Sequence, residues 1–120
     1  MLNCLAVGVG GFVGAVLRYL VSMIPLDKTG SFPVNTLLIN VLGAFAIGAI
    51  TALGAKTAGL YPRLTLLLKT GICGGFTTFS TFALETAGLI QSGRIGASAA
   101  YMLLSVTLSV AAVLLAEAVV

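Results

Sequence analysis

The stretch GICGGFTTFSTF, residues 71–82, decides the fold expected for this chain. It places three glycines, three phenylalanines and four hydroxyl side chains inside residues 64–90, a segment otherwise apolar enough to cross a membrane. At about 1.5 Å per residue an unbroken helix over residues 64–90 would run about 40 Å, longer than the roughly 30 Å hydrocarbon layer. Glycine is a poor helix former and threonine diverts backbone hydrogen bonds, so we expect a break at GICGG and the hydroxyls that follow it.

A break at membrane depth has a structural consequence. Backbone that is not helical is tolerated there only when it is buried in protein or faces a cavity. We therefore expect the break at the centre of the assembly, with carbonyls exposed on one side and amide donors on the other. The alternative is an intact helix whose glycines serve close packing.

Composition sets the class of protein around this stretch. Apolar residue types make up 59% of the 120 residues and charged types 8%, whereas a globular domain carries about 25% charged residues. The sequence predicts an all-α integral membrane protein with one four-helix transmembrane domain over residues 1–120. The first span has no Lys or Arg ahead of its apolar run, so we expect it to be retained rather than removed as a secretory signal. The four spans are predicted at Leu2 to Ile24, Val34 to Leu53, Leu64 to Ile90 and Ile95 to Val120.

Basic residues near span ends normally set the orientation of a membrane protein. Here the two predicted membrane faces carry equal numbers of basic residues. The face of the two termini has Lys56, Arg63 and Lys69, and the opposite face has Arg18, Lys28 and Arg94. The tie favours dual topology, in which a chain inserts both ways up and pairs with an inverted copy. The alternative is one fixed orientation with a charge assigned to the wrong face.

Small residues favour close helix packing. Gly10 and Gly14 form a GxxxG motif, and Asn40, Ala44 and Gly48 recur every fourth residue. A lone four-helix bundle has little room for a solute path, so we expect oligomerisation. The GxxxG motif alone is as typical of packing within one chain as of a dimer contact.

Polar side chains form two stripes within the apolar spans. Thr36 and Asn40 are one turn apart on the second span, and Tyr101, Ser105 and Ser109 repeat every fourth residue on the last. An asparagine at membrane depth requires a partner, so Asn40 is predicted to face protein or water. The alternative for each Ser or Thr is a bond to another helix or to a carbonyl of its own helix.

The lining that these stripes would build contains hydrogen-bond donors and no charge. The first and second spans contain no acidic residue, and Glu85 and Glu117 lie towards span ends. This argues against a cation pore built on carboxylate rings and favours a small anion. Cys4 and Cys73 are isolated and histidine is absent, which indicates neither a disulfide framework nor a metal site of such side chains.

Phe79 and Phe82 lie three residues apart beside the expected break. Such rings usually pack in a core. Because an aromatic ring has a positive edge, rings turned edge-on to a narrow path would also attract an anion weakly.

At these residues the chain closely resembles the Fluc (CrcB) family of fluoride channels, small four-span bacterial membrane proteins. The most specific match is GGFTTFSTF, residues 74–82, followed by Glu85; the second is NTLLIN, residues 35–40, which ends in Asn40. The resemblance runs from the first span to the serine stripe of the last. It implies an antiparallel homodimer in the bacterial inner membrane, with two fluoride pores along the dimer interface.

The resemblance also implies roles for individual residues. Asn40 resembles the pore asparagine, and Phe79 and Phe82 resemble the paired rings of the fluoride path. Glu85 is expected to pair or cap within the third helix rather than bind an ion. Further pore positions are Ser80, Thr81, Tyr101, Ser105 and Ser109; Arg18 corresponds to a basic vestibule position, and the backbone carbonyls of Gly74 and Thr77 to ligands of a structural Na⁺ at the dimer centre.

The function implied is passive exit of cytoplasmic fluoride, with fluoride, a second copy of the chain and membrane lipid as partners, and no nucleic acid. No acid–base pair for chemistry is visible, so an enzyme is not expected. One alternative is a small dual-topology drug or cation exporter, although Leu2 to Ile24 lacks the acid that such exporters carry in their first span. Another is a purely structural membrane subunit, which would not explain Asn40 and the hydroxyl stripes.

Overall fold

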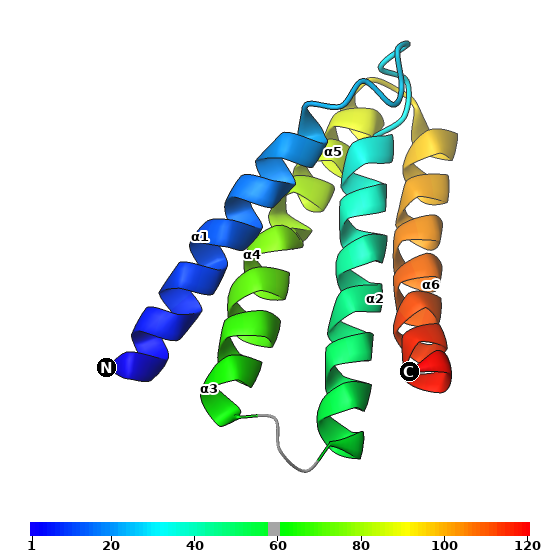
Figure 1. Cartoon of the computed structure of the whole chain (residues 1–120). Coiled ribbons are helices and arrows are strands. Elements are labelled where there is room, and N and C mark those ends of the chain that lie inside the picture. Colours follow the sequence, from blue (N-terminus) through cyan, green and yellow to red (C-terminus); the bar gives the residue numbers. More distant parts are fainter. Residues whose placement is uncertain (58–60) are drawn as a thin grey trace.

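The chain is all-helical over the residues that the computed structural model describes, 1–57 and 61–120. The link predicted between the second and third spans includes residues 58–60, which lie outside the described residues. The two termini lie at the same end of the molecule (Figure 1). In chain order the elements are α1 (Leu2–Ser22), α2 (Val34–Lys56), α3 (Pro62–Thr65), the π-helix η1 (Leu66–Cys73), α4 (Gly74–Phe76), α5 (Phe79–Gln91) and α6 (Ile95–Val119).

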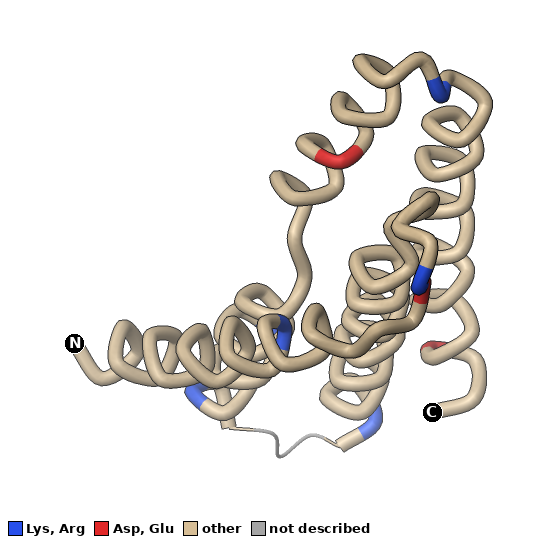
Figure 2. Tube along the Cα trace, turned by 90° about the horizontal axis from the view of Figure 1, so that it is seen from above, with Lys and Arg blue, Asp and Glu red and all other residues tan. Residues whose placement is uncertain are grey.

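Three of the four predicted spans are single long helices. α1, α2 and α6 are each long and apolar enough to cross a membrane. Charged side chains are sparse along them, and whole turns of the trace carry none (Figure 2). The described part of the chain is therefore an all-α membrane protein, with the remaining segment divided into shorter pieces.

The predicted interruption of the third segment is present, at the threonines that follow GICGG. The glycines of GICGG are helical: Gly71 belongs to η1, and Gly74 and Gly75 belong to α4. The backbone becomes extended at Thr77 (ψ 158°) and Thr78 (φ −150°, ψ 120°). The break expected at GICGG and the hydroxyls that follow it is therefore found at the hydroxyl end of that stretch, where side chains and not glycine flexibility end the helix.

The two threonines terminate the two halves by different bonds. The Thr77 hydroxyl and amide both donate to the Cys73 carbonyl, at 2.9 Å and 3.0 Å. The Thr78 hydroxyl accepts a bond from the Thr81 amide at 3.1 Å, which makes Thr78 the N-cap of α5. A threonine pair at this point therefore ends one helix and starts the next.

The glycines serve close packing between α1 and the first half of the broken segment, which lie side by side (Figure 1). A Cβ atom added at Gly10 would lie 2.8 Å from the Cα of Gly71, and one added at Gly75 would lie 2.6 Å from the carbonyl oxygen of Gly11. Glycine lets helix backbones approach this closely, because no side chain stands between them. The GxxxG motif of Gly10 and Gly14 is thus used within the chain.

A second helix pair is formed by α2 and α6 (Figure 1). A Cβ atom at Gly48 would lie 2.8 Å from the Val113 carbonyl oxygen, and Ala112 and Ala116 of α6 are buried. The small-residue stripe of α2 therefore also serves internal packing. α5 contacts α6, so the second half of the broken segment joins the two pairs.

The link between α1 and α2 is ordered by one carboxylate. Asp27 accepts bonds from the Thr29 hydroxyl at 2.7 Å and the Phe32 amide at 2.8 Å, and Gly30 takes a positive φ of 64°. These bonds place the Phe32 ring edge-on to Tyr101, with centroids 5.5 Å apart. The link thereby contacts α6 through this ring pair.

These bonds make a prediction about pH. The Thr29 hydroxyl and the Phe32 amide lower the pKa of Asp27 from its ordinary 3.8 to about 2. Since the folded pKa is depressed, the contribution of this carboxylate is complete above pH 3.8 and is lost as the pH falls through about 2. The exchange rate of the Phe32 amide, corrected for its intrinsic pH dependence, should therefore be constant from neutral pH down to about pH 3.8 and should rise as the pH falls through about 2.

Replacing Asp27 by alanine should accelerate exchange at Phe32 about tenfold at neutral pH, because its amide loses a charged acceptor. Hydrogen exchange read by mass spectrometry measures this. Unchanged protection in Asp27→Ala would mean that the carboxylate does not hold the link.

Candidate functional site

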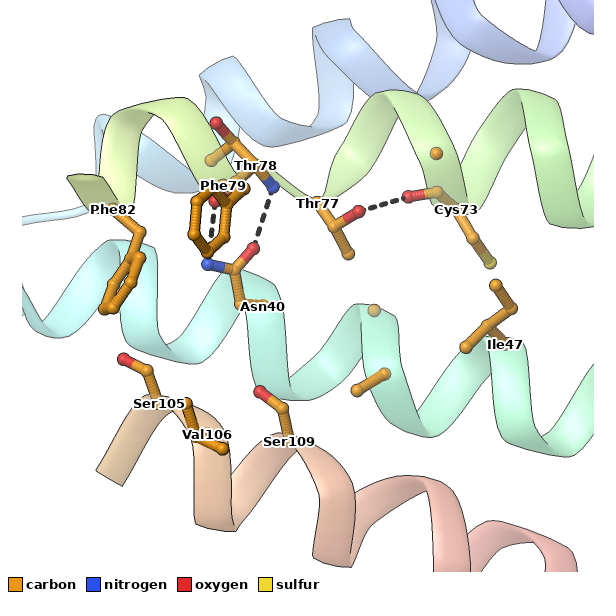
Figure 3. A pocket seen from close by; sticks show the side chains of 13 residues that line it. Asn40, Ile47, Cys73, Thr77, Thr78, Phe79, Phe82, Ser105, Val106 and Ser109 are labelled. Carbon is orange, nitrogen blue, oxygen red and sulfur yellow. Dashed lines mark hydrogen bonds between the residues drawn. The ribbon is translucent and has the colours of Figure 1, made fainter. Parts of the chain in front are cut away.

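A cavity of about 330 Å³ lies between α2, α6 and the two halves of the broken segment (Figure 3). It collects five of the predicted pore residues and both predicted sodium ligands. Figure 3 shows Asn40, the two phenylalanine rings and the two serines around the same space. Its lining comprises Asn40, Gly43, Ala44, Ile47, Cys73, Gly74, Thr77, Thr78, Phe79, Phe82, Ser105, Val106 and Ser109.

Asn40 joins α2 to the break. Its Nδ2 donates to the Thr78 carbonyl at 3.0 Å, and its Oδ1 accepts from the Thr78 amide at 2.8 Å. One partner is a donor and the other an acceptor, so the orientation of the carboxamide is determined by the backbone. The expectation that Asn40 faces protein at membrane depth is met by this pair of bonds, shown as dashed lines in Figure 3.

The aromatic residues form a connected row. Phe79 and Phe82 have centroids 5.5 Å apart, and Phe82 lies 5.0 Å from Tyr101. Tyr101 is fully buried, whereas Phe79 is 78% exposed on this single chain. The row therefore runs from the protein interior to an open face.

The buried serines of α6 behave differently from the threonines of the chain. The Thr86 and Thr107 hydroxyls donate to the carbonyls four residues earlier, at 2.7 Å and 2.6 Å, as expected for hydroxyls in helices. The Ser98 and Ser105 hydroxyls are buried and have no hydrogen-bond partner within the described chain. Ser105 is also a lining residue of the first cavity, although its Oγ atom is itself buried.

Glu85 does not pair within its own helix, which corrects the sequence-based expectation. Its Oε2 accepts from the Thr36 hydroxyl of α2 at 3.0 Å, and its Oε1 accepts from the Tyr101 hydroxyl of α6 at 2.8 Å. One carboxylate thus joins three elements. Thr36 and Tyr101 face this carboxylate and do not line the first cavity.

A second cavity, of about 320 Å³, lies against α1 on another side of the break. The Arg18 Nε donates to the Gly75 carbonyl at 3.1 Å, so this cation sits at the C-terminal end of the first half-helix. Thr78 lines both cavities. The second cavity is lined by Ala15, Arg18, Tyr19, Ser22, Thr36, Ile39, Thr78 and Thr81.

The remaining predicted residue, Ser80, is exposed and lies 3.4 Å from the Thr78 hydroxyl, outside both cavities. Sequence reasoning missed the capping role of Thr78. A signal existed, because a threonine directly before a helical segment is a preferred N-cap. The lining residues Gly43, Ile47 and Val106 carried no signal, since apolar residues are everywhere in these helices.

Comparison with known proteins rests on matches along most of the chain. The sequence profile described as "CrcB-like protein, Camphor Resistance (CrcB)" matches residues 5–117. The chain belongs to the CrcB family. The match takes in α1, both halves of the broken segment and nearly all of α6, so every residue of the two cavities lies inside it.

Relatives of this CrcB-family chain are similar over three quarters or more of their length. A protein from Ruminiclostridium cellulolyticum, named fluoride-specific ion channel FluC, is 47% identical over 112 residues, which cover 92% of this chain and 83% of the relative. A protein of the same name from Chlorobaculum tepidum is 53% identical over 95 residues, covering 78% and 75%. Another from Agrobacterium fabrum is 42% identical over 114 residues, covering 94% and 91%.

Membership of the CrcB family establishes the broad class of this protein. With three long apolar helices, this CrcB-family chain is a multi-pass bacterial membrane protein. The names of its relatives describe ion channels, which are not a class of enzyme.

Proposed function

We propose that the chain forms a fluoride-selective channel through which cytoplasmic fluoride leaves passively, down its electrochemical gradient. The carrying observation is that relatives named as fluoride-specific channels are 42–53% identical over most of the chain. The first cavity agrees with this function. Its lining includes the Asn40 amide, two serines and two aromatic rings, and it contains no charged side chain.

Neutral donors suit a small anion that must leave again. They replace part of its hydration shell, whereas a buried lysine would hold it in a deep well. Phe79 and Phe82 can present positive ring edges between these donors. The N-terminus of α5, capped by Thr78, adds the positive end of a helix beside the second cavity.

The working unit proposed is an antiparallel homodimer of four-span subunits with two pores. The first cavity is open on one side, and Phe79 on its rim is largely exposed. An exposed ring beside a membrane-depth asparagine and serines calls for a protein neighbour rather than lipid. The tied basic residues support insertion in both orientations, which an inverted pair requires.

We propose that the fluoride path runs beside the break in the third segment. The second cavity, with Arg18 and the hydroxyls of Thr78 and Thr81, would be the vestibule that attracts the anion. Thr78 lines both cavities and connects this vestibule to the path of Asn40 and the two rings. Glu85, held by Thr36 and Tyr101, lies beyond Phe82 along the aromatic row.

A structural Na⁺ at the dimer centre is proposed on the carbonyls of Gly74 and Thr77. Described side chains offer no cluster of His, Cys, Asp or Glu for a metal, so backbone oxygen is the donor that fits a hard cation. Gly74 is exposed beside the first cavity, and a Cβ there would meet only the Lys69 carbonyl oxygen, at 3.8 Å. When bound, the ion would neutralise carbonyl dipoles at the end of the first half-helix.

Anion efflux from liposomes tests the function. Vesicles carrying the purified protein should release fluoride within seconds of the membrane potential being collapsed by an ionophore, and retain chloride. Equal release of both anions would reject selectivity. Release of an organic cation, with fluoride retained, would instead identify an exporter.

A further inference from the structure

We infer that Asn40 is a positioning residue for the cation site: its clamp on Thr78 keeps the Gly74 carbonyl out of a helical hydrogen bond and free to hold the ion, while the Thr78 hydroxyl does the same for the Thr77 carbonyl. The inference rests on the proposed Na⁺ site. It adds the side-chain hydrogen bonds that keep the ligand carbonyls of this site free. The same carboxamide lines the anion cavity, so one side chain serves both ions.

The hydrogen bonds around the break carry the argument. In a continuous α-helix each carbonyl accepts from the amide four residues later. The Gly74 carbonyl would accept from the Thr78 amide, but that amide donates to Asn40 Oδ1 at 2.8 Å. The Thr77 carbonyl would accept from the Thr81 amide, which donates to the Thr78 hydroxyl at 3.1 Å. The two proposed ligands are thus the carbonyls whose helical donors have been diverted by side chains.

The neighbouring carbonyls have other partners. The Cys73 carbonyl accepts from both the amide and the hydroxyl of Thr77. The Gly75 carbonyl accepts from Arg18 at 3.1 Å. Around the break, other bonds therefore occupy the carbonyls of residues 73 and 75, whereas side chains take the helical donors of the carbonyls of residues 74 and 77.

Asparagine is suited to this role because its carboxamide has the same hydrogen-bond donor and acceptor groups as a peptide bond. It offers a donor and an acceptor side by side, which match the carbonyl and amide of Thr78 as a neighbouring strand would. Serine lacks the second polar atom, and a leucine of similar size offers neither. The second N–H of Nδ2 stays available to the cavity, so clamping does not remove Asn40 from the anion path.

The clamp predicts a change in cation affinity that is separate from anion flux. Without it the Thr78 amide can return to the Gly74 carbonyl, and helix 62–76 can extend through the ligands. Asn40→Leu should raise the Na⁺ concentration for half-maximal thermal stabilisation at least about tenfold, as loss of an outer-shell partner does at other metal sites. Thr78→Val should give a smaller shift, since it frees only the Thr81 amide, and Thr78→Ser should behave as wild type.

Purified dimer in detergent, titrated with Na⁺ against N-methylglucamine at constant ionic strength, provides the readout. Thr107→Val is the matched control, because it removes a hydroxyl from the exposed side of α6 and should leave the Na⁺ midpoint unchanged.

The outcomes separate the inference from the proposal beneath it. If the thermal stability of the wild-type protein does not depend on Na⁺, both the cation site and the clamp are overturned. The proposed fluoride efflux is not affected by that result. A wild-type response to Na⁺ that Asn40→Leu retains in full overturns the clamp alone. If Asn40→Leu is not recovered folded, Asn40→Ser decides, because the shorter side chain cannot bond both backbone groups of Thr78: a Na⁺ midpoint equal to that of the wild type overturns the inference.

Discussion

Gly14→Ala is expected to yield little or no folded protein. A Cβ atom at Gly14 would lie against the Ile72 carbonyl and 2.8 Å from the Phe76 amide nitrogen. Both neighbours are helical backbone and cannot rotate away, so α1 would have to move off the broken segment. Overpacking of this kind costs about 3 kcal/mol or more, a large share of the stability of a small bundle.

The control for this prediction lies on the same helix. A Cβ atom at Gly8 meets nothing within 4 Å, so Gly8→Ala should express and assemble as wild type. Yield of monodisperse protein after detergent extraction, and its thermal midpoint, measure the difference. Equal midpoints for the two variants would show that α1 does not pack on the broken segment as described.

The second large effect is expected in fluoride flux. Phe82→Leu and Phe79→Leu should each slow fluoride efflux at least about tenfold, which corresponds to about 1.4 kcal/mol on the barrier. Leucine keeps much of the apolar volume but has no positive ring edge to offer an anion. Phe82 should show the larger loss, because it also contacts Tyr101, the partner of Glu85.

Assembly must be scored alongside flux. Both variants should elute at the same volume as the wild-type protein, since side-chain volume is largely conserved at each position. Phe12→Leu is the matched control: Phe12 is an exposed ring on α1 outside both cavities, and its loss should leave efflux unchanged. Full flux in both the Phe79 and Phe82 variants would remove the rings from the proposed path.

The stretch 71–82 was predictable in kind and not in detail. The length of residues 64–90 against the membrane thickness required an interruption, and the structure has one. Its place depended on which backbone groups find partners: Thr78 is held by Asn40, 38 residues away. The helical glycines fit against glycines of α1, a match that only the packed pair reveals.

Glu85 illustrates the same limit. Its place in the signature was visible, but its partners Thr36 and Tyr101 come from helices 49 and 16 residues away in sequence. A carboxylate near a span end can pair along its own helix or across the bundle, and periodicity does not choose between them. The packing of α2 and α6 near α5 determines that Glu85 pairs across the bundle.

Sequence by itself determined the membrane class, the long helices, the need for a break and most of the residues around the first cavity. Those features follow from composition and from helical spacing, which act locally along the chain. Tertiary structure decided where the break lies, which carbonyls it releases and which helices the glycines join. Those features depend on hydrogen bonds and backbone contacts between distant segments, and such partners exist only once the helices have packed.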